Sequence, residues 1–77
     1  MQIFVKTLTG RKHAFSFEPE VNILAVKRQL QEQEGIDMKQ IRLIYAGRQL
    51  SDGKKTLAEY KVAAGKVIHM VLQMRAG

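Results

Sequence analysis

Cysteine is absent from the 77 residues of the chain. Without it there is neither a disulfide framework nor a thiolate metal site, and thiol catalysis is excluded. No apolar run approaches the length of a membrane span, and the N-terminus has the pattern of a strand rather than of a signal peptide. We therefore expect no membrane association, and we take the cytoplasm and nucleus as the expected compartments because nothing in the sequence restricts them.

The motifs of enzymes are also missing. His13 and His69 lack the spacing of metal ligands, and no glycine-rich phosphate loop stands between a strand and a helix. A chain of this length forms one small domain with a single core, which leaves little space for an internal active site. The sequence thus predicts no enzymatic activity, no catalytic residue, no metal and no cofactor, with His13 as a structural residue at the rim of an apolar face.

Acidic side chains are scarce. Seven Asp and Glu residues stand against 13 Lys and Arg, which gives a formal net charge of +6. This excess favours acidic partners, whether nucleic acid, anionic membrane or an acidic protein surface. The basic residues are spread among turns and strand faces without a recognition motif or stacking aromatics, so nucleic acid is the weaker alternative. Basic residues around a protein-binding face explain the charge equally well.

Apolar residues, at 45% of the chain, are as frequent as in folded soluble domains. Residues 1–6 alternate between apolar and polar, and a turn ending at Gly10 leads to a return strand over residues 11–17. Phe15 and Phe17 lie on the face of the return strand that is expected to pack in the core. This pattern predicts a β-hairpin.

A helix is predicted after the hairpin. Pro19 ends the return strand because proline cannot donate to a strand ladder. Asn22 is well placed as the N-cap of a helix over residues 23–34, and Gly35 stops it. The apolar residues that recur on one face of this helix are Ile23, Val26 and Leu30. Their spacing predicts an amphipathic helix laid on a sheet.

Two strands and a helical turn are predicted next. Residues 41–45 form a strand in which Ile44 faces away from the core side, and a turn leads to a short strand over residues 48–50. Residues 56–59 have the capping-box pattern of threonine with glutamate three residues on, which is enough for one helical turn ending at Tyr60.

The last strand, residues 67–72, is apolar almost throughout, which is typical of a strand with neighbours on both sides. We expect it to lie in the centre of the sheet. After it the pattern stops, and residues 74–77 offer little that packs. We therefore expect a folded domain over residues 1–73 followed by a flexible C-terminal tail.

Several segments together resemble the ubiquitin family: MQIFVKTLTG at the start, RLIYAGRQL and TLAEY in the second half, and IHMVL before a basic tail of small residues. The resemblance spans essentially the whole chain and requires one extra residue within residues 53–56. It implies the α+β fold called β-grasp, or ubiquitin-like, in which a mixed five-stranded sheet packs on one main helix, with a short helical turn besides. It also implies a monomer.

Family members that act as modifiers have their terminal glycine carboxylate activated, passed to enzyme cysteines and joined to lysine amines of target proteins. By resemblance, Gly77 and Ala76 are the conjugation residues, and Gln73 and Arg75 contact the activating enzyme. The implied partners are ubiquitin-like activating and conjugating enzymes, ubiquitin-binding domains and covalently bound targets. The alternative is a ubiquitin-like interaction domain, natural or engineered, that is not conjugated and acts only by protein binding.

The resemblance also implies a surface for noncovalent partners. The partner-binding positions of the family correspond to Leu8, Arg42, Ile44, Gly47, Arg48, His69 and Val71. We call Leu8, Ile44, His69 and Val71 the apolar patch, with a basic rim of Arg42 and Arg48. The alternative is a set of scattered surface hydrophobes. The alternation of side chains along the strands points both Ile44 and Val71 away from the core, and the implied fold makes their strands neighbours. This predicts a contiguous surface rather than scattered hydrophobes.

Two of the lysines through which family members form chains are retained, Lys6 and Lys27, and these are the candidate acceptor lysines. We expect Lys27 to be mostly buried and paired with Asp52, which is a structural role. The other acceptor positions of the family carry residues that do not serve as ordinary acceptors, namely Arg11, Gln29, Gln33, Arg48 and Ala64. The sequence therefore predicts a tag that seldom extends into polymers.

The tail departs from the family at two positions that bear on chemistry. Ala76 places a methyl group where the family has glycine, in a segment that enzymes thread through a narrow channel. Gln73 removes a cation that the family uses to select its activating enzyme. We expect inefficient charging by the ordinary ubiquitin pathway, with either a dedicated activating enzyme or a purely noncovalent role.

Overall fold

The computed structural model describes residues 1–73. Its elements in chain order are β1 (Gln2–Lys6), β2 (Lys12–Ser16), α1 (Ile23–Glu34), η1 (Met38–Gln40), β3 (Ile41–Tyr45), β4 (Arg48–Gln49) and β5 (Val67–Leu72). The five strands and the long helix begin and end within one residue of the bounds that the sequence predicts. The tail predicted over residues 74–77 lies outside the described residues.

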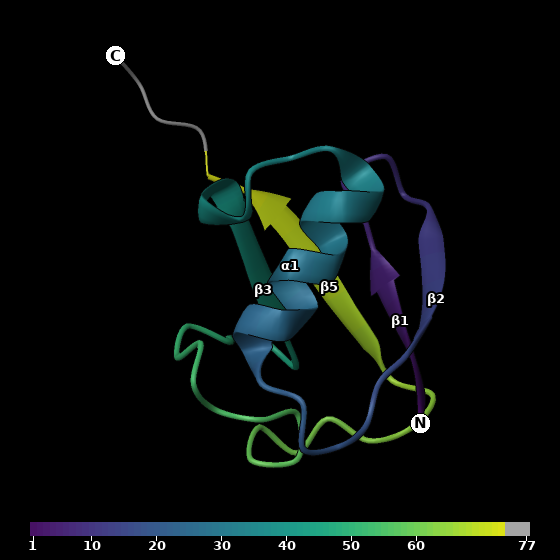
Figure 1. The fold of residues 1–77 in the computed structure, drawn as a ribbon. Coiled ribbons are helices and arrows are strands. Elements are labelled where there is room, and N and C mark those ends of the chain that lie inside the picture. Colours follow the sequence, from purple (N-terminus) through teal and green to yellow (C-terminus); the bar gives the residue numbers. More distant parts are fainter. Residues whose placement is uncertain (74–77) are drawn as a thin grey trace.

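The five strands form one mixed sheet in the order β2-β1-β5-β3-β4. β1 pairs with β5 in parallel, while the β1–β2, β3–β5 and β3–β4 pairs are antiparallel. Figure 1 shows α1 lying across one face of this sheet. β5 therefore lies in the middle, as its apolar sequence predicts, and the β-grasp architecture is confirmed.

The ends of α1 are fixed by the residues that the sequence indicates. The Asn22 side chain accepts a hydrogen bond from the Ala25 backbone N–H at 2.9 Å, so one of the unpaired donors of the first turn is satisfied. At the other end Gly35 has a φ of 68°, a left-handed conformation that glycine adopts without strain, and its N–H bonds to the Gln31 carbonyl. No helix within residues 1–73 has the length and apolar character needed to cross a membrane.

The core lies between α1 and the inward-facing residues of the sheet. Alternation along each strand sends every second side chain toward the helix. The largest fully buried side chains on α1 and on the strands are Ile3, Val5, Ile23, Val26, Leu30, Ile41, Leu43 and Ile68. All of them are apolar, so the same residues that give the helix and the strands their periodicity also hold them together.

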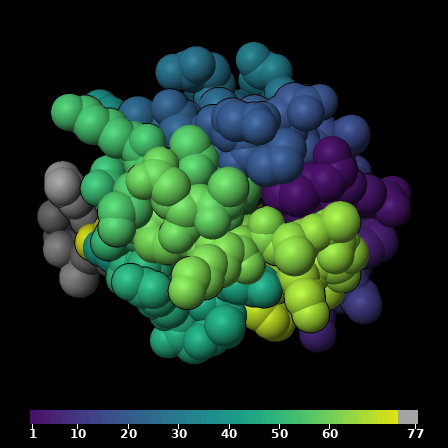
Figure 2. Space-filling model, turned by 90° about the horizontal axis from the view of Figure 1, so that it is seen from below, coloured from purple at the N-terminus to yellow at the C-terminus, as the bar shows by residue number. Residues whose placement is uncertain are grey.

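The segment after β4 closes one end of this core. Figure 2, which views the molecule from below, shows this segment in green on the side facing the viewer, beside the blue helix and the purple N-terminus. Leu50, Leu57 and Val62 are its buried apolar residues. The Tyr60 ring is buried beside them, and its hydroxyl accepts a hydrogen bond from the Asp52 N–H at 2.9 Å. A segment without strands or a regular helix is thereby anchored to the domain.

The short helical elements differ in position from the prediction. Both bonds of the capping box form, since the Thr56 N–H donates to Glu59 Oε1 at 3.2 Å and the Glu59 N–H donates to Thr56 Oγ1 at 3.0 Å. The chain there makes a hydrogen-bonded turn rather than a helix, because Lys61 already adopts a φ of 62°. The short 3-10 helix is instead η1, where Asp37 Oδ1 accepts from the Lys39 N–H.

Candidate functional site

The outer face of the sheet, opposite α1, brings the central residues of the apolar patch together. In the antiparallel register of β3 and β5, Ile44 lies directly opposite His69, and Arg42 lies opposite Val71. Ile44 and Val71 are half-buried and His69 is exposed. The structure thus places these three patch residues on adjacent strands, with their side chains on the face that α1 leaves open.

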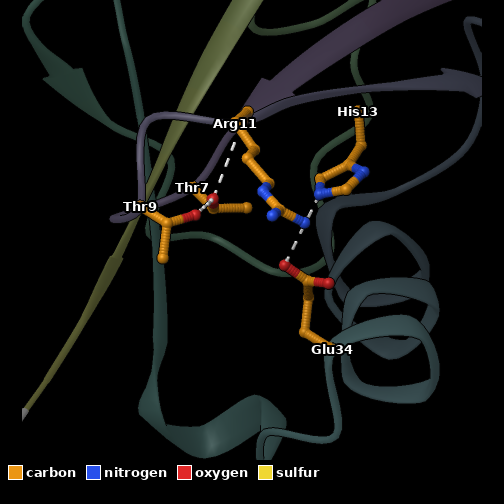
Figure 3. A network of polar contacts seen from close by, with 5 residues as sticks. All are labelled: Thr7, Thr9, Arg11, His13 and Glu34. Atoms are coloured by element: carbon orange, nitrogen blue, oxygen red, sulfur yellow. Dashed lines mark hydrogen bonds and ion pairs between the residues drawn. The ribbon is translucent and has the colours of Figure 1, made fainter.

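Leu8 approaches the patch from the turn between β1 and β2. Its side chain is 61% exposed, the largest exposure of any bulky apolar residue described. The turn is held by a Thr7 Oγ1 to Thr9 Oγ1 hydrogen bond of 2.9 Å, drawn in Figure 3. Because Lys6 lies opposite His69 in the parallel register, the turn that follows Lys6 lies at the His69 end of the patch.

The two arginines of the expected rim take different positions. Arg42 shares the outer face with Ile44, and its Nη2 donates to Gln73 Oε1. Arg48 lies opposite Tyr45, so its side chain leaves β4 on the other face of the sheet from Ile44. Its guanidinium lies 5.8 Å from the centre of the Tyr60 ring. The structure therefore brings Arg42, but not the Arg48 guanidinium, to the face of the patch.

Gly47 lies beside the patch in the turn between β3 and β4. Its φ is 75° and that of Ala46 is 52°, so two successive residues are left-handed, as in the tight turns that join antiparallel strands. This turn fixes the register in which Gln49 lies opposite Ile44. Gln49 is exposed and extends the outer face to β4. Gln49 is not among the patch residues that the resemblance implies, although strand parity alone indicates it.

The base of the C-terminal tail is tied to the sheet and to η1. The Gln73 N–H donates to the Gln40 carbonyl at 2.7 Å, and its side chain accepts from Arg42. A polar cavity of about 320 Å³ beside it is lined by Asp37, Lys39, Gln40 and Gln73. The structure thus holds Gln73, one predicted contact of the activating enzyme, in a defined place. The other predicted tail residues, Arg75, Ala76 and Gly77, lie outside the described residues.

Comparison with known proteins identifies this arrangement. The sequence model of the ubiquitin family matches residues 3–75. The chain belongs to the ubiquitin family. It is 42% identical over its whole length to the ubiquitin-like protein NEDD8 of Dictyostelium discoideum, of which it covers 99%, and 42% identical to ubiquitin-like protein 1 of Schizosaccharomyces pombe, of which it covers 97%. These matches indicate a ubiquitin-like modifier rather than an enzyme.

A relative of another kind shares the same domain. The large proline-rich protein bag6-A of Xenopus laevis is 42% identical over 71 residues, which are 92% of this chain and 6% of that protein. The ubiquitin fold therefore also occurs as a small part of a much longer chain.

The two lysines retained from the ubiquitin family differ in access. Lys6 is exposed at the end of β1, whereas Lys27 on α1 is half-buried. Burial lowers the pKa of the Lys27 amine, and the positive charge of Arg42 lowers it further. The lowered pKa favours the nucleophilic free amine, but burial limits the access of a thioester to it, so the exposed Lys6 is the better candidate of the two.

The expected pairing of Lys27 with Asp52 is wrong. Among residues 1–73 the ion pair that forms is His13 with Glu34. Asp52 Oδ1 instead accepts from the Lys54 N–H at 3.0 Å, and its carbonyl accepts from the Lys55 N–H at 3.1 Å. Asp52 thus caps the turn that contains the extra residue of this chain, and a short acidic side chain engaged locally does not reach across to the helix.

His13 links the hairpin to the end of the helix. Its Nε2 lies 3.9 Å from Glu34 Oε1, and both side chains are partly exposed. Figure 3 draws this contact as a dashed line. The pair is ionic only when the imidazole is protonated. No group of three or more side chains suited to a metal ion occurs within residues 1–73. The surroundings of His13 agree with the structural role that the sequence predicts for it.

Proposed function

We propose that this member of the ubiquitin family is a protein modifier that is joined through the Gly77 carboxylate to lysine amines of target proteins. The carboxylate would be activated with ATP, transferred to an enzyme cysteine as a thioester, and transferred again to the amine with release of the thiol. Noncovalent partners would then recognise the conjugate through the apolar patch. Activating and conjugating enzymes and ubiquitin-binding domains are its partners in this proposal.

The observation that carries the proposal is the pairing of Ile44 with His69 on the open face of the sheet, next to Val71 and Arg42. Adjacent half-exposed apolar side chains with a cation at their edge form a surface that excludes water from the centre of an interface. The same strand, β5, continues into Gln73 and the tail. One element would therefore serve both recognition and conjugation.

We propose further that a dedicated activating enzyme charges the chain, rather than the enzyme that charges ubiquitin. Gln73 replaces a family cation, and Arg42 already occupies its side-chain oxygen. Loss of a charge-assisted contact costs on the order of 1.5 to 3 kcal/mol. The names of the full-length relatives, NEDD8 and ubiquitin-like protein 1, support a pathway distinct from that of ubiquitin.

An ATP-dependent thioester assay with the ubiquitin-activating enzyme tests this pathway. We expect weak charging of the unaltered chain and rescue by Gln73→Arg combined with Ala76→Gly, because the cation and the slender backbone would then be restored. Gln33→Arg, which adds a cation on the exposed side of α1, is the matched control and should not rescue. Efficient charging of the unaltered chain would refute the dedicated pathway.

A second candidate function is that of a nonconjugated interaction domain. The match to a small part of bag6-A supports it, because there the ubiquitin-like region is embedded in a longer protein. Deletion of Gly77 separates the two candidates. If the deletion abolishes conjugates in cells and also the biological effect of the chain, the modifier is supported. If the effect persists through the apolar patch without conjugates, the interaction domain is supported.

Chain formation offers a separate test of the modifier. We propose that conjugates carry single additions, since one retained acceptor lysine is half-buried and the other acceptor positions of the family are lost. Mass spectrometry of purified conjugates would show this directly, with abundant polymers through several lysines as the contrary result. Further candidates for such linkages are the N-terminal amine and lysines outside the family positions, such as Lys54, Lys55, Lys61 and Lys66. We propose the cytoplasm and nucleus as the compartments, which imaging of the tagged chain tests.

A further inference from the structure

The acidic and basic residues of this chain are distributed unequally over the fold. All seven carboxylate side chains lie outside the five strands, in α1 and in the connecting segments. The strands carry Lys6, Lys12, Arg42 and Arg48. Because no strand contributes an acidic side chain, the charged side chains that the strands place on the outer face are all positive. Such a surface attracts negatively charged groups.

The strand registers place two of these cations in line with the apolar patch. Lys12 lies opposite Lys6, Lys6 lies opposite His69, and His69 lies opposite Ile44. We call Lys12, Lys6, His69 and Ile44 the cross-strand row. Directly opposed side chains on a sheet have Cβ atoms about 5 Å apart. The row is therefore a continuous line across four strands, with a positive end on β2 and β1 and an apolar end on β3.

The positive end of the row is costly for the isolated chain. Like charges directly opposite each other on a sheet destabilise it. Within residues 1–73, the one ion pair is His13 with Glu34, so neither Lys6 nor Lys12 is neutralised by a carboxylate of the described fold. Arg42, at the other edge of the patch, already donates to Gln73. Arg42 keeps its charge in this contact but is half-buried, whereas Lys6 and Lys12 are both exposed, so the more accessible cations lie at the Lys6 and Lys12 end.

We propose that the cross-strand row binds an acidic protein segment in one fixed direction. An apolar side chain of the segment contacts Ile44, and carboxylates of the segment lie against Lys6 and Lys12. The inference rests on the proposed recognition function of the apolar patch and adds the charge and the orientation of the partner. Charge complementarity distinguishes this segment from apolar segments without acidic residues. It also places the acidic residues of the segment at the Lys6 and Lys12 end of the row.

The composition of the row favours a protein segment over nucleic acid. A nucleic-acid strand gains affinity from stacking of its bases on aromatic side chains along a basic groove. The cross-strand row contains no aromatic side chain other than the imidazole of His69, which separates its cations from the apolar Ile44, and the strongly exposed Leu8 lies in the turn that follows Lys6. An apolar centre with charges at one end matches the centre and rim of a protein interface.

Binding of paired synthetic peptides tests the proposal. The probe is a helical peptide with an apolar face of leucine and alanine and with glutamates at one end, and its counterpart has glutamines in their place. A short single-stranded oligonucleotide is the third probe. The variants are Lys6→Gln with Lys12→Gln, the matched control Lys54→Gln with Lys61→Gln, and Ile44→Ala. Lys54 and Lys61 are exposed and lie off the strands, so the control removes equal charge elsewhere.

We expect the unaltered chain to prefer the glutamate peptide and the Lys6 and Lys12 variant to lose that preference, with about a fivefold fall in affinity. The control should retain the preference. Equal affinity for both peptides, an equal fall in the control, or tighter Lys6-dependent binding of the oligonucleotide would overturn the proposal. Ile44→Ala is judged separately. If it weakens both peptides while the charge variant changes nothing, the apolar patch stands and the directed acidic partner does not.

Discussion

The two faces of the sheet use the same strands for different purposes. Toward α1, side chains such as Val5, Leu43 and Ile68 are apolar and have no exposed surface. On the outer face their neighbours in sequence, Lys6 and Ile44 among them, are exposed or half-exposed and include cations. Because side chains alternate along a strand, each face can change without changing the other. Stability is therefore concentrated on one face, and the recognition that we propose uses the other, so substitutions can test that separation.

The largest expected effect on stability is on the inner face. Leu30→Ala removes a fully buried side chain of α1 and leaves a cavity, so we expect the free energy of unfolding to fall by about 2 to 5 kcal/mol. Denaturant titration measures the loss. Gln33→Ala, on the exposed side of the same helix, is the control and should change stability by less than about 0.5 kcal/mol. A small loss in Leu30→Ala would mean that the core is not where the structure places it.

The corresponding change on the outer face is Ile44→Ala. We expect it to weaken binding to a ubiquitin-binding domain by about tenfold or more, because Ile44 lies at the centre of the patch. Its effect on unfolding should be well below that of Leu30→Ala, since Ile44 is only half-buried. Calorimetric titration and thermal unfolding measure the two quantities. Val67→Ala removes a half-buried apolar side chain opposite Phe4, at the other end of β5 from Val71, and should weaken binding much less than Ile44→Ala.

The helix cap offers a change that touches neither face. Asn22→Ala removes the acceptor of the Ala25 N–H and should lower the free energy of unfolding by about 1 kcal/mol. Affinity of the folded fraction for a ubiquitin-binding domain should not change. Asn22→Ser, which keeps a side-chain acceptor, should recover most of the loss. If the alanine variant lost affinity without losing stability, the two faces would not be independent.

A smaller effect of the opposite sign is expected on the outer face. Lys12→Thr removes one of two opposed cations, so at low salt the free energy of unfolding should rise by about 0.5 kcal/mol. The gain should shrink as salt screens the repulsion. Lys54→Thr, on an exposed loop, is the control for the change in net charge. Destabilisation by Lys12→Thr at low salt would show that the opposed lysines do not repel.

The smallest expected effect is a dependence on alkaline pH. The folded state lowers the pKa of Lys27 through burial and the charge of Arg42. Below this lowered pKa the amine is charged in both states, and its charge opposes folding. Between the lowered pKa and the ordinary pKa the unfolded chain binds more protons, so stability rises with pH. As pH rises toward the ordinary pKa of lysine, the penalty is relieved. The difference in unfolding free energy between the unaltered chain and Lys27→Met should therefore shift in favour of the unaltered chain. A difference that is flat across this range would argue against the shift.

Periodicity predicted nearly all of the fold, because the alternation of each strand and the helical spacing of Ile23, Val26 and Leu30 are local properties of the sequence. It did not predict η1, since three residues are too short to show a period. It also missed the opposition of Lys6 and Lys12, which depends on register. The pairing of Asp52 with Lys27, expected when the lysines of the family were compared, was wrong because the carboxylate caps its own turn. The resemblance to the ubiquitin family supplied the patch residues, whereas parity alone places Arg42, Ile44, His69 and Val71 on the outer face but does not supply Leu8 in its turn.

The parallel pairing of β1 with β5 also determines how the domain responds to force. β1 and β5 run side by side in the same direction, so the start of β1 and the end of β5 lie at opposite ends of the sheet (Figure 1). A pull applied between the N-terminus and the end of β5 slides the two strands along each other. Their hydrogen bonds are then loaded together and do not open one at a time. A domain held both at its N-terminus and at the end of β5 thus resists extension along its own axis, whereas a pull that peels β5 away from β1 breaks one hydrogen bond after another.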